Sequence, residues 1–367
     1  MDVVRKHYNR FPYPPVPRVA LPRAGSAPGI AWETGRGFAG DAEARHKGIR
    51  ILVAGAGTLE ALVVAQQHPR AAQVVAVDLS ASSLELLRHR TLLARLASLT
   101  LGLGLFRRVA PLKTVEADLA TWEDPEGFDY IVATNVLHHH AQPLMLLARL
   151  AGMLRDGGVL RLTTYPRASR FWPRAIGRWL RLGGITADTP DLVQAAIQRA
   201  AELPSDHPIR LAFADNPESR HAASLSDAYL HPVELPQHPL EWGRAVGALG
   251  LRLVGEGQHP LSQSAALHEL CPATARLSPW EKLQILDDVM ELGSNPVLWL
   301  HKTGEGAETP LPDVPRPEVG GTGAPPGEGL VLTPGLELSR VAPGTSLWLP
   351  SDLHVEMARG LLRADAL

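Results

Sequence analysis

The stretch IRILVAGAGTLE, residues 49–60, decides the fold that we expect. Residues 49–55 form an apolar run of the kind found in strands that are buried on both faces of a sheet. Gly55 and Gly57 follow where this strand ends. Glycine permits a tight turn there and lets a ligand approach the backbone. Because residues 58–68 are predicted to be helical, the stretch indicates a strand, a glycine turn and a helix.

The same alternation of short strands and helices continues to residue 165. Strands are predicted at residues 73–78, 113–118, 129–134 and 159–164. A capping box, Ser82 to Glu85, is predicted to open one long helix, and Pro143 another. Further on, a helix at 242–249 and strands at 251–256 and 296–301 are predicted after a helical insertion. This order predicts an α/β fold with a doubly wound, mostly parallel sheet and a helical lid insertion.

These patterns divide the chain into six segments. Prolines are dense at the start, so we expect an irregular leader there, without long helices. A Pro/Gly-rich linker follows the last strand. The segments are a leader or cap (1–48), the ligand-binding core (49–165), the lid (166–235), the end of the core (236–302), the linker (303–328) and a C-terminal appendage (329–367).

Composition narrows the functional classes. The chain has 367 residues, a formal net charge of −2 and one cysteine, Cys271, so an intrachain disulfide is excluded. The polar start is unlike a signal peptide, and no apolar run reaches the roughly 18–20 residues that span a bilayer. We therefore expect a soluble, cytoplasmic protein with no transmembrane segment. The balanced charge gives no reason to expect nucleic acid as a partner. The oligomeric state stays open.

Two carboxylates stand where predicted strands end. Asp78 closes the second strand, where a carboxylate accepts hydrogen bonds from ribose hydroxyls. Asp118 follows the third strand and would accept from the amine of adenine, next to the apolar Leu119. A dinucleotide site would have a third glycine at position 60, where this chain has Glu60, whose charge repels a pyrophosphate. The alternative, a glycine turn with two helix-capping aspartates, stays open.

The ordered segments VAGAGT, AVDLS, EADL, FDYIVATNVLHHHAQP and LRDGGVLRLTTY resemble the motifs of class I S-adenosylmethionine-dependent methyltransferases. The opening HYNRFPYP resembles a leader found in one bacterial group of these enzymes, where it lies over the cofactor. The resemblance implies a Rossmann-like sheet of seven strands with the last antiparallel, and S-adenosylmethionine as the cofactor. The implied cofactor-binding residues are Gly55, Gly57, Thr58, Asp78, Leu79, Asp118, Leu119 and Asn135.

The resemblance assigns parts of the cofactor to these residues and shows two departures. Gly55, Gly57 and Asn135 would face the methionine part, Asp78 the ribose and Asp118 the adenine. The family usually has an acidic residue before the first glycine and often a glycine after the threonine. This chain has Ala54 and Leu59 there, which keeps open a non-catalytic module that retains only the fold.

Histidines are the candidate catalytic residues. Methyl transfer from a sulfonium needs alignment above all, and a base only when the acceptor must lose a proton. His138, His139 and His140 follow the fourth strand, and at most two of them can face one pocket; packing under the lid is the alternative. Asp227 and His231 are four residues apart, so on one helix the carboxylate would orient the imidazole. We name His138, His139 and His231 as catalytic candidates and predict no metal site.

Arginines open the insertion at spacings of three and four. They are predicted to form the solvated basic face of a lid helix, and an anionic substrate, a membrane surface or RNA are the alternatives. The leading functional hypothesis is methyl transfer to a small molecule. A protein or RNA methyltransferase, a binding module and a nucleotide-dependent oxidoreductase remain as alternatives. The arginines are Arg167, Arg170, Arg174, Arg178 and Arg181.

Overall fold

A computed structural model describes residues 2–22, 27–100, 108–257, 267, 276–289, 292 and 295–303. The expected appendage at 329–367, the linker beyond residue 303 and Cys271 lie outside the described residues.

The described residues form a seven-stranded sheet with the order β3-β2-β1-β4-β5-β7-β6. Strands β1 to β5 pair in parallel, and β7 is antiparallel to both of its neighbours, as predicted. The strands are β1 (Arg50–Ala54), β2 (Gln73–Asp78), β3 (Leu112–Glu116), β4 (Phe128–Thr134), β5 (Leu154–Thr163), β6 (Leu251–Glu256) and β7 (Val297–Lys302).

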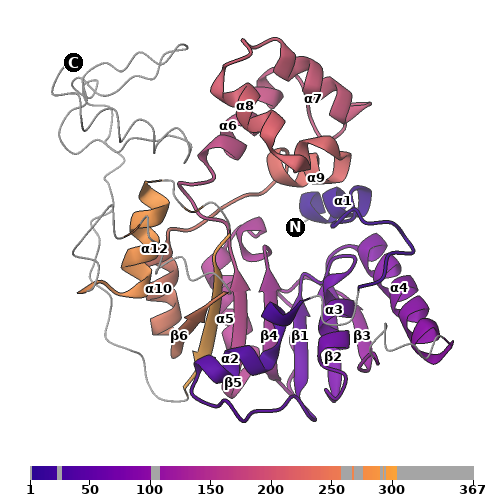
Figure 1. Cartoon of the computed structure of the whole chain (residues 1–367), viewed down its shortest axis with the longest axis vertical. Helices are drawn as coiled ribbons and strands as arrows, with labels where there is room; N and C mark the ends of the chain where they lie inside the picture. The colour runs from indigo at the N-terminus through magenta and orange to yellow at the C-terminus, as the bar shows by residue number, and fades with distance from the viewer. Residues whose placement is uncertain are drawn as a thin grey trace.

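Helices cover both faces of the sheet (Figure 1). Alternate residues of β1 point to opposite faces: Ile51 and Val53 belong to one hydrophobic cluster, Leu52 and Ala54 to the other. Ile51, Leu52 and Val53 are fully buried, and burial of each such side chain stabilises the fold by roughly 1.5–3 kcal/mol. One face is covered by α2 (Trp32–Phe38), α3 (Glu60–Gln67) and α4 (Ala81–Thr100), the other by α5 (Pro143–Met153), α10 (Pro239–Ala248) and α12 (Pro279–Asp288).

The strand order places the ligand site. The chain runs from β1 to β2 and β3 on one side, and then to β4 and β5 on the other. Parallel sheets bind ligands outside the carboxyl ends of the strands where the order reverses. Here that point lies between β1 and β4, which pair in parallel from Ile51 to Ala54.

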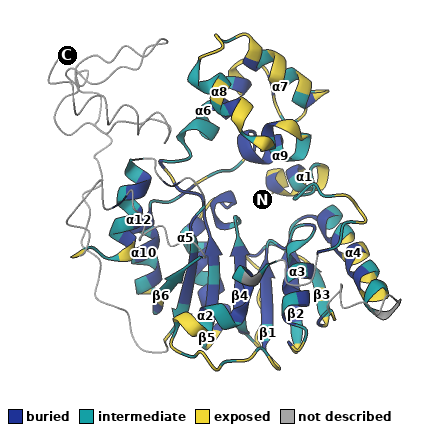
Figure 2. Cartoon of the chain, viewed as in Figure 1, coloured by how far each residue is buried: buried dark blue, intermediate teal, exposed yellow. Residues whose placement is uncertain are grey.

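The insertion between β5 and α10 is a small helical layer with a core of its own. It lies beyond the carboxyl edge of the sheet, and its outward helix faces are exposed (Figures 1 and 2). Ile176, Leu180, Ala196, Phe213 and Leu225 are among its buried residues. Its helices are α6 (Phe171–Leu182), α7 (Leu192–Ala201), α8 (Pro208–Asp215), η3 (Pro217–Arg220) and α9 (Ala222–Tyr229).

The N-terminal leader is less irregular than predicted. It contains α1 (Asp2–Arg10) and η1 (Pro28–Ile30), and α2 lies within the same segment. The expectation was wrong for α1 because the prolines begin only at Pro12, and the residues before it place Val4 and His7 on one buried side. Figure 1 shows α1 between α9 of the lid and the core.

The long helix α4 does not begin with the predicted capping box. It begins at Ala81, and the Oγ atom of Ser80 accepts a hydrogen bond of 3.1 Å from the backbone N–H of Ser83. The hydroxyl of Ser82 instead donates to the carbonyl of Asn9 at 3.0 Å. The leader therefore uses the serine that was expected to cap the helix.

Within the described part of the chain, no helix combines the length and apolar character needed to span a membrane.

Candidate functional site

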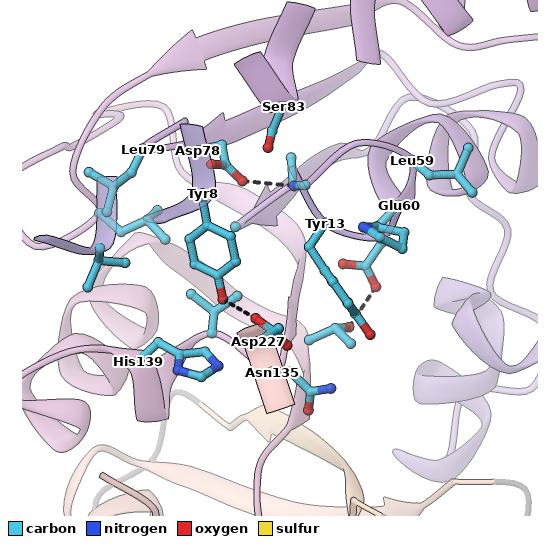
Figure 3. Close-up of a pocket in the computed structure, with 18 of the residues that line it drawn as sticks. Tyr8, Tyr13, Leu59, Glu60, Asp78, Leu79, Ser83, Asn135, His139 and Asp227 are labelled. Carbon is cyan, nitrogen blue, oxygen red and sulfur yellow. Dashed lines mark hydrogen bonds between the residues drawn. The ribbon is translucent and has the colours of Figure 1, made fainter. Parts of the chain in front are cut away.

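A cavity of about 420 Å³ opens at the reversal point of the sheet (Figure 3). Its wall contains seven of the eight residues named above as cofactor-binding; Thr58 is the exception. Leader and lid residues complete the wall, which includes Tyr8 and Tyr13 from the leader and Asp227 from the lid. Segments far apart in sequence thus enclose one space.

The glycine turn forms the floor of the cavity. Gly55 and Gly57 have φ values of +68° and +53°, a left-handed conformation that favours glycine. The N–H groups of Gly55 and Ala56 donate to the carbonyl of Val77 at 2.9 and 3.1 Å. The turn is therefore fastened to the end of β2.

Asp78 links this turn to the helix that follows β2. Its two carboxylate oxygens each accept a bond of 2.8 Å, Oδ2 from the N–H of Gly57 and Oδ1 from the N–H of Ser80. Burial raises the pKa of Asp78, and these backbone N–H groups oppose the rise. A carboxylate oxygen has more than one acceptor site, so Asp78 can also accept from hydroxyl groups in the cavity.

Leu79, Asp118 and Leu119 line the cavity beyond Asp78. The Oδ1 atom of Asp118 accepts from the N–H of Ala120 at 2.9 Å, which fixes the carboxylate after β3. Two leucines with a carboxylate beside them make an apolar slot with a polar edge. The planar shape of a purine and its exocyclic amine suit such a slot.

Asn135 follows β4 at the opposite end of the cavity. It has a φ of +54°, and a left-handed conformation is uncommon for a residue other than glycine. Its N–H donates to the carbonyl of Thr163 at 2.9 Å, and its Oδ1 accepts from Asn295 at 3.2 Å. Both bonds hold the side chain at the cavity wall.

Glu60 is partly buried in the same wall and takes part in a chain of hydrogen bonds. The hydroxyl of Thr134 donates to Glu60 at 2.6 Å, and the guanidinium of Arg161 donates to that hydroxyl at 3.2 Å. Burial raises the pKa of Glu60, whereas Thr134 and Arg161 lower it. Sequence reasoning used Glu60 only to argue against a pyrophosphate and did not place it in the site.

The charges of the wall are of one sign. Among the described residues that line the cavity there are four carboxylates and neither a lysine nor an arginine. A ligand rich in phosphate would therefore lack a cationic partner there, whereas a cation would be attracted. The carboxylates belong to Glu60, Asp78, Asp118 and Asp227.

Thr58 binds the leader. It is fully buried, its N–H donates to the carbonyl of Tyr13 at 3.0 Å, and its hydroxyl donates to the carbonyl of Pro14 at 2.8 Å. The buried Arg90 of α4 donates to the carbonyls of Thr58 at 2.6 Å and Val16 at 2.7 Å. Sequence reasoning missed Arg90, because a lone arginine in a helix gives no sign of such contacts.

The three adjacent histidines have different surroundings. His139 and His140 line the cavity, and His138 does not. The His138 ring stacks on Tyr165 with centroids 3.7 Å apart, and its Nδ1 accepts from the Tyr165 N–H at 3.2 Å. The His139 Nδ1 bonds to the carbonyl of Val233 at 2.9 Å. Burial lowers the pKa of His139 to about 4 and that of His138 well below its usual range.

Asp227 and His231 were predicted to share one face of a helix. They do not, because α9 ends at Tyr229. Asp227 instead accepts a hydrogen bond of 2.9 Å from the hydroxyl of Tyr8 in the leader. Burial raises the pKa of Asp227 to about 6, and the bond from Tyr8 opposes the rise. His231 is buried behind the cavity wall, with its Nδ1 at 2.5 Å from the carbonyl of Val233.

The predicted solvated arginine face is only partly present. Arg178 and Arg181 are exposed, but Arg170 precedes α6 and forms a largely buried ion pair of 2.8 Å with Glu234. The Arg170 guanidinium also lies 3.7 Å from the ring centroid of Tyr165. The expectation was wrong for Arg170, because spacing along a helix does not show where the helix begins.

Comparisons with known proteins agree with this architecture. Residues 52–160 match the profile of a family described as "Methyltransferase domain". The chain is 25% identical over 293 residues to "Uncharacterized protein syc1184_c" of Synechococcus sp., covering 76% of this chain and 66% of that protein. A segment of 57 residues is 39% identical to "Uncharacterized methyltransferase Mb0092" of Mycobacterium bovis, covering 15% of this chain and 29% of that protein.

Among solved structures, PKMT2 from Rickettsia typhi has a similar fold. Its TM-score is 0.57 at 15% identity, with 78% of this chain and 55% of that chain covered. A second structure of PKMT2, in complex with AdoHcy, has a TM-score of 0.56 at 16% identity, covering 81% of this chain and 56% of that chain. The chain thus spans less than two thirds of the length of these relatives. The profile match shows that residues 52–160 belong to a methyltransferase domain, and the sheet order agrees with the Rossmann-like fold of such domains.

Proposed function

We propose that this protein transfers a methyl group from S-adenosylmethionine to a small-molecule acceptor inside the cavity. The observation that carries the proposal is the charge of the wall, with four carboxylates and no lysine or arginine among the described lining residues. S-adenosylmethionine carries a sulfonium and an ammonium group, which such a wall attracts. A dinucleotide carries a pyrophosphate, which it repels.

The strand order supports one orientation of the cofactor. The order β3-β2-β1-β4 sets Asp118, Asp78, the glycine turn and Asn135 in one row. Asp118 with its neighbouring leucines would hold the adenine, Asp78 the ribose hydroxyls, and Asn135 with Glu60 the methionine end. The acidic Glu60 supplies a partner for the ammonium that Ala54, at the end of β1, does not. The bound sulfonium supplies an activated methyl group.

The leader and the lid define the acceptor space. His139, Tyr8 and Asp227 form the wall at the lid side of the cavity (Figure 3). The whole cavity, which would hold cofactor and acceptor together, has a volume of about 420 Å³ and lies within the usual range of small-molecule pockets. Enclosure aligns the acceptor and excludes water, which is the protein's main task in an in-line displacement.

We assign different tasks to the three catalytic candidates. His139 contacts the acceptor, since it lines the cavity. His138, stacked on Tyr165, and His231, whose ring centroid lies 3.8 Å from that of His139, hold His139 in place.

Titration calorimetry with the full chain tests the cofactor. S-adenosylhomocysteine is expected to bind, and NAD⁺ is not. Binding of NAD⁺ alone would make the protein an oxidoreductase, and binding of neither would make it a scaffold.

Methyl-labelled S-adenosylmethionine tests the acceptor class. The protein is incubated with separate low-molecular-weight, protein and RNA fractions of one cell extract. Label is expected in the low-molecular-weight fraction. Label that enters only the protein or RNA fraction would overturn the proposed acceptor class.

A further inference from the structure

Three potential metal ligands meet between the leader and the lid. They are His7 of α1, Asp227 of α9 and His231, two residues after α9. One nitrogen or oxygen atom from each lies within 4.8 Å of the others. All three residues are buried, with exposed fractions of 7%, 5% and 5%. The site is thus assembled by residues that are far apart in sequence.

Each of the two histidines has a ring nitrogen without a partner. The Nε2 atoms of His7 and His231 are buried and form no hydrogen bond. Buried polar atoms are nearly always bonded, and each exception calls for an explanation such as an ion. No hydrogen bond joins these three described side chains to one another, although they lie close together. The unpartnered nitrogens are therefore available to a shared ligand.

The orientation of His231 also suits a ligand. Its Nδ1 lies 2.5 Å from the carbonyl oxygen of Val233 and 3.1 Å from the N–H of the same residue. These two contacts occupy Nδ1, so Nε2 is the ring nitrogen that is available to a ligand. A metal-bound histidine commonly has its other ring nitrogen held by a backbone carbonyl in this way.

Asp227 is held in the same way. Its Oδ1 accepts a hydrogen bond of 2.9 Å from Tyr8, the residue that follows His7 (Figure 3). This bond fixes the carboxylate and leaves its other oxygen available. Two imidazoles and one carboxylate suit Zn²⁺ and similar transition-metal ions, whereas Mg²⁺ and Ca²⁺ prefer oxygen ligands.

We propose that His7, Asp227 and His231 bind a divalent transition-metal ion, with Zn²⁺ as the representative. Ligand atoms at ~2.1 Å from a tetrahedral ion lie ~3.4 Å apart. The three atoms here lie within 4.8 Å of one another, so binding would draw the cluster together by at most about 1.4 Å. Sequence reasoning predicted no metal site, because the positions of these residues follow no metal-ligand spacing.

The ion would fasten the leader to the lid. His7 and His231 do not line the cavity, whereas Asp227 does, so the ion lies behind the wall that covers the methyl acceptor. Its task is then to hold the leader and the lid together over the cavity. The inference goes beyond the proposed function and holds whether or not the chain transfers methyl groups.

The test uses the full chain after treatment with a chelator and removal of the chelator. Zn²⁺ is titrated by calorimetry, and Co²⁺ is added separately to record its visible absorption spectrum. We expect one ion per chain and a Co²⁺ spectrum typical of nitrogen and oxygen ligands in a low-symmetry site. In His7→Gln and Asp227→Asn the affinity for Zn²⁺ is expected to fall at least ~100-fold, since even outer contacts of metal ligands are worth 10–100-fold.

His221→Gln is the matched control, because His221 is exposed and lies at the start of α9. This variant should bind Zn²⁺ like the parent protein. Circular dichroism establishes that each variant is folded, and His7→Gln lies outside the cores of sheet and lid. Failure of the parent protein to bind one ion per chain would overturn the proposal. So would an affinity that is equal in all variants or that falls equally in His221→Gln.

Discussion

Replacement of Arg90 by methionine should detach the leader from the domain. The Arg90 side chain is fully buried, and its guanidinium donates to the carbonyls of Thr58 at 2.6 Å, Val16 at 2.7 Å and Pro17 at 3.2 Å. Methionine keeps most of the apolar stem but has no donor. The three carbonyl groups would lose their charged partner.

The two short bonds determine the expected size of the effect. A hydrogen bond to a charged group contributes about 1.5–3 kcal/mol, so their loss should lower the free energy of unfolding by ~3–6 kcal/mol. Because Thr58 also donates to the carbonyls of Tyr13 and Pro14, loss of the Arg90 bonds should loosen the part of the leader that closes the cavity. The affinity for S-adenosylhomocysteine should fall with it.

Urea unfolding followed by circular dichroism measures the first effect, and calorimetry the second. Arg88→Met is the matched control, since Arg88 is exposed on the same helix and surface substitutions usually change stability by less than ~0.5 kcal/mol. If Arg90→Met unfolds at the same urea concentration as Arg88→Met, the leader is not held as described.

Three further predictions concern the lid, the core and the turn. Asp287→Ala should expose the base of the lid to limited proteolysis. The buried carboxylate of Asp287 accepts hydrogen bonds of 2.9–3.1 Å from three successive backbone N–H groups at residues 167–169. Unchanged cleavage would contradict this role. Burial lowers the pKa of His68 to about 4, and its Nε2 accepts a hydrogen bond from the Trp32 N–H. The stabilising contribution of the neutral imidazole is therefore complete above pH ~6.5 and is lost as the pH falls towards 4. His68→Gln should therefore flatten the dependence of unfolding free energy on pH in that window, and an unchanged slope would refute the assignment. Gly57→Ala should weaken binding of S-adenosylhomocysteine, because its φ is +53° and a Cβ atom would lie 2.7 Å from the Tyr13 carbonyl oxygen; calorimetry showing parental affinity would disprove this.

The sheet was predictable because each strand has a local signal. The apolar runs at β1 and β2 are long enough to be buried on both faces, and the glycine turn marks the point where β1 ends. Helix starts were less predictable. Ser82 has the right neighbours for a cap, but its hydroxyl is used by the leader, and that contact depends on the tertiary fold.

The residues that line the cavity were predictable where they follow a strand directly. Asp78, Asp118 and Asn135 reach the cavity because parallel strands end at one edge. Residues that the leader and the lid supply were harder to predict, because nothing in the sequence connects Tyr8 with Asp227. For the same reason the sequence did not show that Thr58, although it lies within the glycine motif, binds the leader.

We propose that Asp78 holds the ribose of an adenosyl sulfonium cofactor. Calorimetric titration of Asp78→Ala with S-adenosylhomocysteine tests it most directly, with circular dichroism to establish that the variant is folded. Loss of two charged hydrogen bonds of ~1.5 kcal/mol each predicts an affinity about 100-fold weaker than that of the parent protein. An affinity equal to that of the parent protein would contradict the claim.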